Sequence, residues 1–152
     1  MSKGCNPNNI NPWVGVEGGS VNITAGDEGE LRDALFQKGP VSVCFQVVGG
    51  FRDYTTGVYS STVCNNTADS VNHAVLAVGY GTDTATTLDY WIVKNSWGAT
   101  WGDKGFFKIQ RGNNTCGIAQ CNSYPQKVFD ASINMNGRMS VREKAHLEYF
   151  TE

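Results

Sequence analysis

Only one segment of this sequence combines helical periodicity with helix start and stop signals, and this limits the folds open to the chain. In DEGELRDALFQKGP, residues 27–40, an apolar face is formed at i, i+3, i+4 spacing by Leu31, Ala34 and Leu35. Acidic residues crowd the first turn, and Gly39 with Pro40 marks the end. The segment predicts one short amphipathic helix of about ten residues.

Most of the remaining regular structure is predicted to be β. The run VSVCFQVV, directly after Pro40, is rich in β-branched residues and ends at a Gly-Gly break. Further strand candidates are residues 73–78, 90–93 and 105–110, while residues 1–26 are expected to be mostly loop with a short strand near 21–24. One helix among short strands indicates an α+β fold on an antiparallel, barrel-like sheet.

Charge and hydropathy argue against two classes of partner. The chain has 152 residues, with 12 Lys and Arg against 14 Asp and Glu, and no run of like charge suited to nucleic acid or an anionic membrane. Its apolar runs are far shorter than the roughly 20 residues that span a bilayer. The polar start MSKGCNPNNINPW shows no signal peptide. We therefore expect neither a nucleic-acid nor a membrane partner.

The cysteines and sequons favour an oxidising compartment. The sequence has five cysteines, so either one thiol is free or its partner is missing. Asn-x-Thr sequons begin at Asn22, Asn65 and Asn113, and such sites are glycosylated only in the secretory pathway. These features conflict with the absence of a signal peptide.

A candidate site centres on His73, one of two histidines in the chain. This imidazole begins the apolar run HAVLAV, and Asn95 ends the later run YWIVKN. An amide beside an imidazole can fix the tautomer and orientation of the ring without adding charge. Trp97 could cover that hydrogen bond and exclude water. We predict that these three residues lie together.

Four runs in this order resemble the papain-like, cathepsin-type cysteine peptidases: KGPVSVCFQ, FRDYTTGVYSSTVC, VNHAVLAVGYG and YWIVKNSWGATWGDKGFFKIQRGNNTCGIAQCNSYP. The resemblance covers residues 5–124 and matches the C-terminal half of the peptidase. It implies the right-hand domain of that fold, an antiparallel barrel-like sheet with one short helix and with the N-terminal helical domain absent. Residues 1–128 would form this half, and residues 129–152 a non-family tail that is loop or weak helix.

The resemblance also implies roles for the candidate residues. His73 matches the catalytic histidine, which pairs with a thiolate and protonates the leaving amine. Asn95 matches the residue that orients the histidine, and Trp97 the indole that covers their contact. Asn72 and Ala74 would flank the histidine at the substrate cleft.

The family relationship further assigns the cysteines. Cys44 and Cys121 match positions in the substrate pocket, where they are either small buried residues or, with Cα atoms within about 7 Å, a disulfide that narrows the pocket. No acid is expected at its bottom, so it should take an apolar side chain. Cys64 and Cys116 match a disulfide of the family, and Cys5 a half-cystine whose partner lies in the missing N-terminal domain.

One essential feature of the family is missing from this sequence. The nucleophile motif C-G-[SA]-C-[WY] does not occur, nor does the preceding glutamine that helps to bind the oxyanion. Cys5, in GCNPNN, lacks the helix N-terminus that would stabilise a thiolate. We therefore expect a cysteine-type endopeptidase by family, acting on peptides or proteins in the lysosome or outside the cell, without a cofactor. The isolated chain should be inactive.

Two other functions fit parts of the sequence. The first is a non-catalytic papain-like binding or decoy module, which keeps the His/Asn scaffold and exposes the apolar surface that the missing half would cover. The second is a metal site on cysteines and His73. It is disfavoured because zinc ligands come as close pairs, whereas Cys116 and Cys121 have four residues between them and there is no second pair.

Overall fold

The computed structural model describes residues 14–130, with side chains described for residues 15–128. It contains one compact unit of residues 20–124 and a second unit whose described part is residues 14–19 and 125–130. Cys5 and most of the expected tail, residues 131–152, lie outside the described residues. The predicted domain boundary after residue 128 therefore stays a prediction.

The predicted helix is present as α1 (Glu28–Gln37), ten residues long. The Asp27 carboxylate caps it by accepting a hydrogen bond from the Glu30 backbone N–H at 2.8 Å. Leu31, Ala34 and Leu35 are buried, as their spacing predicted. No helical segment among the described residues is long and apolar enough to cross a membrane.

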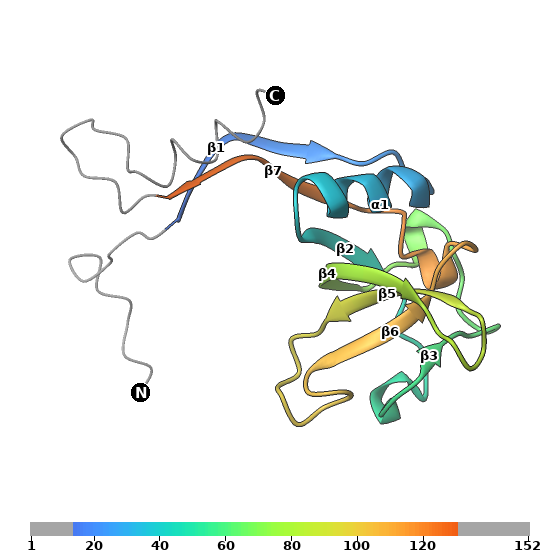
Figure 1. Cartoon of the computed structure of the whole chain (residues 1–152). Coiled ribbons are helices and arrows are strands. Elements are labelled where there is room, and N and C mark those ends of the chain that lie inside the picture. Colours follow the sequence, from blue (N-terminus) through green and yellow to red (C-terminus); the bar gives the residue numbers. More distant parts are fainter. Residues whose placement is uncertain (1–13, 131–152) are drawn as a thin grey trace, which may run out of the picture. The chain divides into compact units, whose positions relative to one another are not determined.

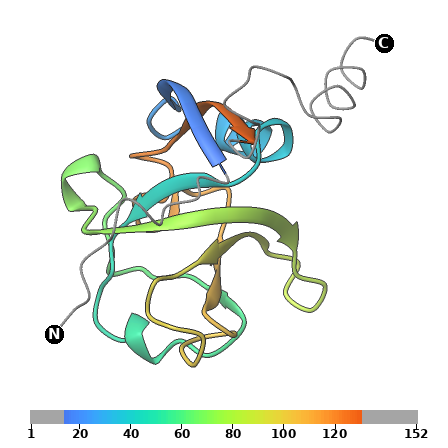
Figure 2. The ribbon, with the colours of Figure 1, turned by 90° about the vertical axis from the view of Figure 1, so that its left-hand side faces the viewer.

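The sheet of the compact unit is mixed and open. Its strand order is β7-β2-β4-β5-β6-β3, and every pairing with a described register is antiparallel except β3 with β6. The strands are β2 (Val41–Phe45), β3 (Val58–Tyr59), β4 (His73–Thr82), β5 (Asp89–Lys94), β6 (Phe106–Gln110) and β7 (Ser123–Asp130). Figures 1 and 2 show α1 beside β2 and the long strand β4. The α+β expectation is confirmed, although the sheet does not close into a barrel.

The expectation for the first 26 residues is wrong within the part that the structure describes. A strand, β1 (Val14–Asn22), occupies most of the described part of this region, and its sheet neighbour is β7. Gly18 and Gly19 both have positive φ, at 80° and 81°, so the segment has the composition of a turn. A Cβ on Gly18 would lie 2.7 Å from the end of the flexible Gln126 side chain, which can move aside, so it is the positive φ that favours glycine here.

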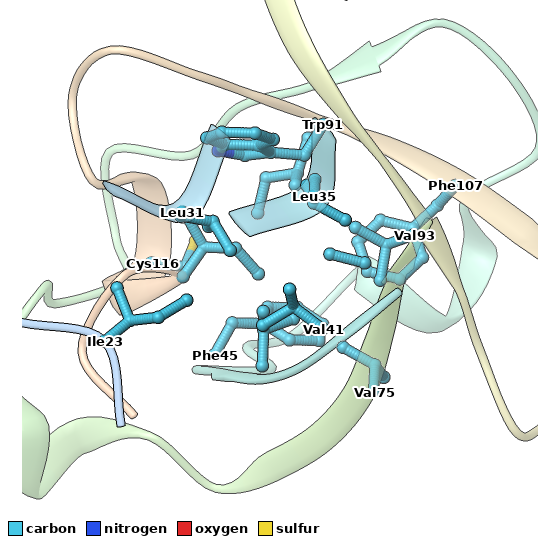
Figure 3. Close-up of a cluster of buried hydrophobic side chains, with 14 of the residues drawn as sticks. Ile23, Leu31, Leu35, Val41, Phe45, Val75, Trp91, Val93, Phe107 and Cys116 are labelled. Carbon is cyan, nitrogen blue, oxygen red and sulfur yellow. The ribbon is translucent and has the colours of Figure 1, made fainter. Parts of the chain in front are cut away.

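The hydrophobic core lies between α1 and the sheet. In Figure 3, Leu31 and Leu35 of α1 lie between Trp91 and the β2 residues Val41 and Phe45. The buried Trp91 indole N–H donates to the Glu28 carboxylate at 2.9 Å, so its polar atom is satisfied. This core fixes β2, β4 and β5 relative to one another, and the candidate site is built at their ends.

Candidate active site

His73 and Asn95 meet at one edge of the sheet. His73 is the first residue of β4, and Asn95 directly follows β5, the antiparallel neighbour of β4. The start of one strand therefore lies beside the end of the other. The His73 Nε2 atom lies 3.0 Å from the Asn95 Oδ1 atom, within hydrogen-bonding distance. Two residues far apart in the sequence are thus brought together, as predicted.

The hydrogen bonds around Asn95 determine which nitrogen of His73 carries a proton. The backbone N–H of Ser96 donates to Asn95 Oδ1 at 2.8 Å, which identifies that atom as the amide oxygen. An oxygen accepts only, so His73 Nε2 is the donor, and Nδ1 is the nitrogen left for a reacting group. Asn95 is 7% exposed, which shields the bond from water.

The other end of the Asn95 amide is unsatisfied. Its Nδ2 atom is buried and has no hydrogen-bond partner among the described residues. A buried donor without an acceptor costs about 1–3 kcal/mol. Such a group does not stabilise the fold, and unpaired polar atoms of this kind are found where residues serve a site.

An aromatic cluster packs against the imidazole. The ring of Trp97 stacks on that of His73, with centroids 5.1 Å apart and an interplanar angle of 28°. Phe45, opposite His73 in the β2–β4 register, lies 5.8 Å away on ring centroids. Trp97 is in turn held by Phe51 at 5.8 Å and Trp101 at 4.9 Å. The imidazole therefore has little freedom to rotate away from Asn95.

Asn72 has a structural role that sequence reasoning missed. Its side-chain oxygen accepts from the Val47 N–H at 2.8 Å, and its side-chain nitrogen donates to the Val47 carbonyl at 3.1 Å. The amide thus replaces a backbone pairing just beyond β2 and fixes the chain immediately before His73. Asn72 also lines an open pocket of about 290 Å³ with His73 and Trp97, but its amide is already bonded to the backbone.

Cys44 and Ala74 lie together on the face of the sheet opposite to His73. In the β2–β4 register, Cys44 is paired with Ala74, and Phe45 with His73. Successive side chains of a strand point to opposite faces. The Cys44 thiol therefore cannot serve His73 as a nucleophile, and its cross-strand neighbour is Ala74.

Cys121 approaches Cys44 from the neighbouring segment. Ser42 of β2 pairs with Ser123 of β7 in antiparallel register. Cys44 stands two residues after Ser42 and Cys121 two residues before Ser123, so continuing the same register places the two cysteines opposite each other. Both thiols are free, with Cys44 half-buried and Cys121 exposed. The expectation of two buried cysteines is therefore wrong for Cys121. Burial raises the pKa of the Cys44 thiol, and the adjacent Cys121 raises it further.

We expect the two thiols to differ in reactivity. Because only the thiolate attacks iodoacetamide, the raised pKa of Cys44 should leave this residue slower than the exposed Cys121 at neutral pH. The rate at Cys44 should rise as pH increases towards its pKa. Peptide mass spectrometry of the alkylated native chain measures both rates. Equal rates at neutral pH, or protection of both residues until a reductant is added, would contradict this.

The expected disulfide is present between Cys64 and Cys116, with Cα atoms 5.1 Å apart. Cys116 is 2% exposed, and its carbonyl accepts from the Gln46 N–H at 2.7 Å, one residue beyond β2. Its φ of 53° is a left-handed conformation, which is uncommon for residues other than glycine. The disulfide therefore lies in a strained turn, and the hydrogen bond from Gln46 holds this turn against the end of β2, the strand that carries Phe45.

The geometry supports proton transfer by His73. One ring nitrogen is bonded to a buried amide, and the ring itself lines an open pocket that a reacting group can enter. Neither free thiol in residues 14–130 shares its face, because Cys44 points to the other side and Cys121 adjoins Cys44. The same residues contain no group of three or more His, Cys, Asp or Glu that could hold a metal ion.

Comparison with known proteins identifies the family of the chain. Residues 2–126 match the family described as "Papain family cysteine protease". The chain is 58% identical to "Pro-cathepsin H" of Medicago truncatula over 107 residues, which are 70% of this chain and 30% of the relative. It is also 58% identical to "Cysteine proteinase 2" of Zea mays over 106 residues, 70% of this chain and 29% of that protein.

A solved structure leads to the same family. The digestive procathepsin L2 proteinase from the Tenebrio molitor larval midgut superposes with a TM-score of 0.66 at 44% sequence identity, covering 72% of this chain and 34% of that one. The chain thus spans about a third or less of the length of these proteins. With a family match over most of its length, this chain belongs to the papain family of cysteine proteases.

Proposed function

We propose that this chain supplies the histidine half of the active site of a cysteine-type endopeptidase. His73 would take the proton of a cysteine thiol, forming a thiolate and an imidazolium, and would then protonate the nitrogen of the leaving amine. Asn95 would hold the ring in the orientation that both transfers need, and Trp97 would keep water from their hydrogen bond.

The hydrogen bond from His73 Nε2 to Asn95 Oδ1, at 3.0 Å, is the observation that carries this proposal. A histidine with only a structural role would need no more than hydrogen-bond partners for its ring nitrogens. Here one nitrogen is bonded to a buried amide, while the ring lies on an open pocket and is stacked by Trp97. This combination supports a positioned acid/base more than a packing role.

We further propose that the nucleophile comes from a part of the peptidase outside this chain. Two cysteines are consumed by the Cys64–Cys116 disulfide, and Cys44 and Cys121 lie away from His73. Without a thiol, His73 has no group to activate. The isolated chain would then be inactive, and an N-terminal peptidase domain would be its partner, with Cys5 as a candidate for a disulfide between them.

The remaining assignments follow from the same proposal. Residues 1–128 would be the C-terminal half of the peptidase domain. Peptides or proteins would be the substrates, and the pocket at Cys44, Ala74 and Cys121 would take an apolar side chain, because these three residues place no charge there. The lysosome or the extracellular space would be the site of action, in keeping with the sequons and the disulfide.

A hybrid enzyme tests the proposal. In it, the segment of maize cysteine proteinase 2 that matches this chain is replaced by the corresponding residues of this chain. We expect the hybrid to hydrolyse a fluorogenic peptide amide and to be blocked by iodoacetamide, because the maize part contributes the thiol. The isolated 152-residue chain should show no turnover in the same assay.

Two results would count against the proposal. A hybrid with a cooperative unfolding transition but no turnover would favour the alternative of a binding module. Turnover by the isolated chain, blocked by iodoacetamide, would mean that a cysteine of this chain is itself the nucleophile.

A further inference from the structure

Arg52 places a positive charge beside the candidate site. Its guanidinium carbon lies 4.8 Å from the centroid of the Trp97 ring, and that ring is stacked on His73 with centroids 5.1 Å apart. A guanidinium over an indole is held there by about 0.5–1 kcal/mol at an exposed position. Arg52 thus lies one aromatic ring away from the imidazole.

The backbone of Arg52 is firmly anchored, although its side chain is exposed. It belongs to the 3₁₀ turn Phe51–Asp53, and the preceding Phe51 is completely buried. The Arg52 carbonyl accepts a hydrogen bond from the indole N–H of Trp101 at 2.8 Å. A charged group carried by a fixed backbone can act as a recognition element, because little ordering is required on binding.

No acidic group of the pocket competes for this cation. The pocket of about 290 Å³ that contains His73 is lined by Val47, Arg52, Asn72, His73 and Trp97, and Arg52 is its one permanently charged member. Among the described residues, Arg52 forms no salt bridge, whereas Arg32 and Arg111 each do. A planar guanidinium binds a carboxylate through two parallel hydrogen bonds.

The chemistry of peptide hydrolysis indicates which part of a substrate lies there. The proton that an imidazole delivers goes to the leaving nitrogen, so the residue beginning at that nitrogen must lie within reach of the ring. We propose that Arg52 binds the side-chain carboxylate of this residue, so that the peptidase favours Glu or Asp directly after the bond it cuts. This inference rests on the proposed function of His73, but the binding it predicts requires no nucleophile.

Peptide binding to the full 152-residue chain tests the inference without any turnover. The probe is the dipeptide amide Glu-Ala, compared with the amides Gln-Ala and Lys-Ala and with Gln-Ala carrying a free C-terminal carboxylate. NMR shifts of the Trp97 indole and His73 ring report binding. At low salt we expect Glu-Ala amide to bind about three- to tenfold more tightly than Gln-Ala amide, and Lys-Ala amide to bind more weakly than both. At about 1 M salt, where the Debye length is about 3 Å, the preference should largely disappear.

Matched variants distinguish binding by Arg52 from a general effect of positive charge on the chain. Arg52→Met should abolish the preference for Glu, Arg52→Lys should retain part of it, and Arg32→Met, which removes an exposed charge on α1, should leave it unchanged. Equal binding of Glu-Ala and Gln-Ala amides, or no perturbation of either ring by any peptide, would overturn the inference. The inference would also be overturned if the preference for Glu-Ala amide persisted in Arg52→Met. The same holds if Gln-Ala with a free C-terminal carboxylate bound as tightly as Glu-Ala amide. An inactive hybrid enzyme together with Arg52-dependent binding would reject the proposed function alone.

Discussion

Replacing His73 with alanine in the hybrid peptidase is expected to lower kcat/KM by about 10²- to 10⁴-fold, the range of a lost general acid/base. The loss should fall mainly on kcat, because the imidazole acts on the reacting groups and contributes little to binding the peptide. Asn95→Ala should lose less, about 10- to 100-fold, since His73 remains but its Nε2 partner at 3.0 Å is gone. Steady-state kinetics on one peptide amide measures all three enzymes.

A charge change away from the site provides the control. Arg32 is exposed on α1 and paired with Asp33 at 2.9 Å, so Arg32→Met should leave kcat/KM within about twofold of the unchanged hybrid. A His73→Ala hybrid that retains most of its activity would show that another group transfers the proton. An Asn95→Ala loss equal to that of His73→Ala, with the fold intact, would mean that orientation of the ring is indispensable.

Removing the Cys64–Cys116 disulfide is expected to have the largest effect on stability. The two cysteines are separated by 52 residues, and closing a loop of that length lowers the entropy of the unfolded chain by an amount worth about 4 kcal/mol. The double variant Cys64→Ala with Cys116→Ala should therefore unfold at a midpoint more than about 10 °C lower. Urea unfolding and thermal circular dichroism of the oxidised chain measure the change.

The free cysteines supply a matched control for this measurement. Cys44→Ala with Cys121→Ala removes the same number of sulfur atoms but no cross-link, so it should change the free energy of unfolding by about 1 kcal/mol or less. A destabilisation as large as that of the disulfide variant would mean that Cys44 and Cys121 are bridged in solution. Equal stability of the disulfide variant and the unchanged chain would mean that the cross-link constrains little of the unfolded state.

The features predicted correctly are those specified by neighbouring residues. Asp27 and the apolar spacing of Leu31, Ala34 and Leu35 define α1 within one segment, because caps and periodicity act over a few residues. Strands β2, β4, β5 and β6 were found by their apolar runs. By contrast, β1 was missed because its Gly18 and Gly19 read as a turn, and only its long-range pairing with β7 makes it a strand.

In the candidate site, too, features marked by the sequence were predicted and features set by long-range contacts were not. The link between His73 and Asn95 was predicted from a chemical pattern and a family resemblance, and the structure places these residues 3.0 Å apart. The bonding of Asn72 to Val47 could not be predicted, because it joins segments whose separation depends on the folded sheet. Arg52 lies in one of the runs that carry the family resemblance, but no chemical pattern marks it there, so its position over Trp97 becomes visible only in three dimensions.

The alkylation rate of the nucleophile in the hybrid tests the central claim most directly, because it reports the thiolate without requiring turnover. With His73 present, iodoacetamide should react rapidly even at mildly acidic pH, since an adjacent imidazolium stabilises the thiolate. In the His73→Ala hybrid, the rate should be low at acidic pH and rise only towards about pH 8.5, as for an ordinary thiol. Identical pH profiles in the two proteins would contradict the assignment of His73 as the group that activates the cysteine.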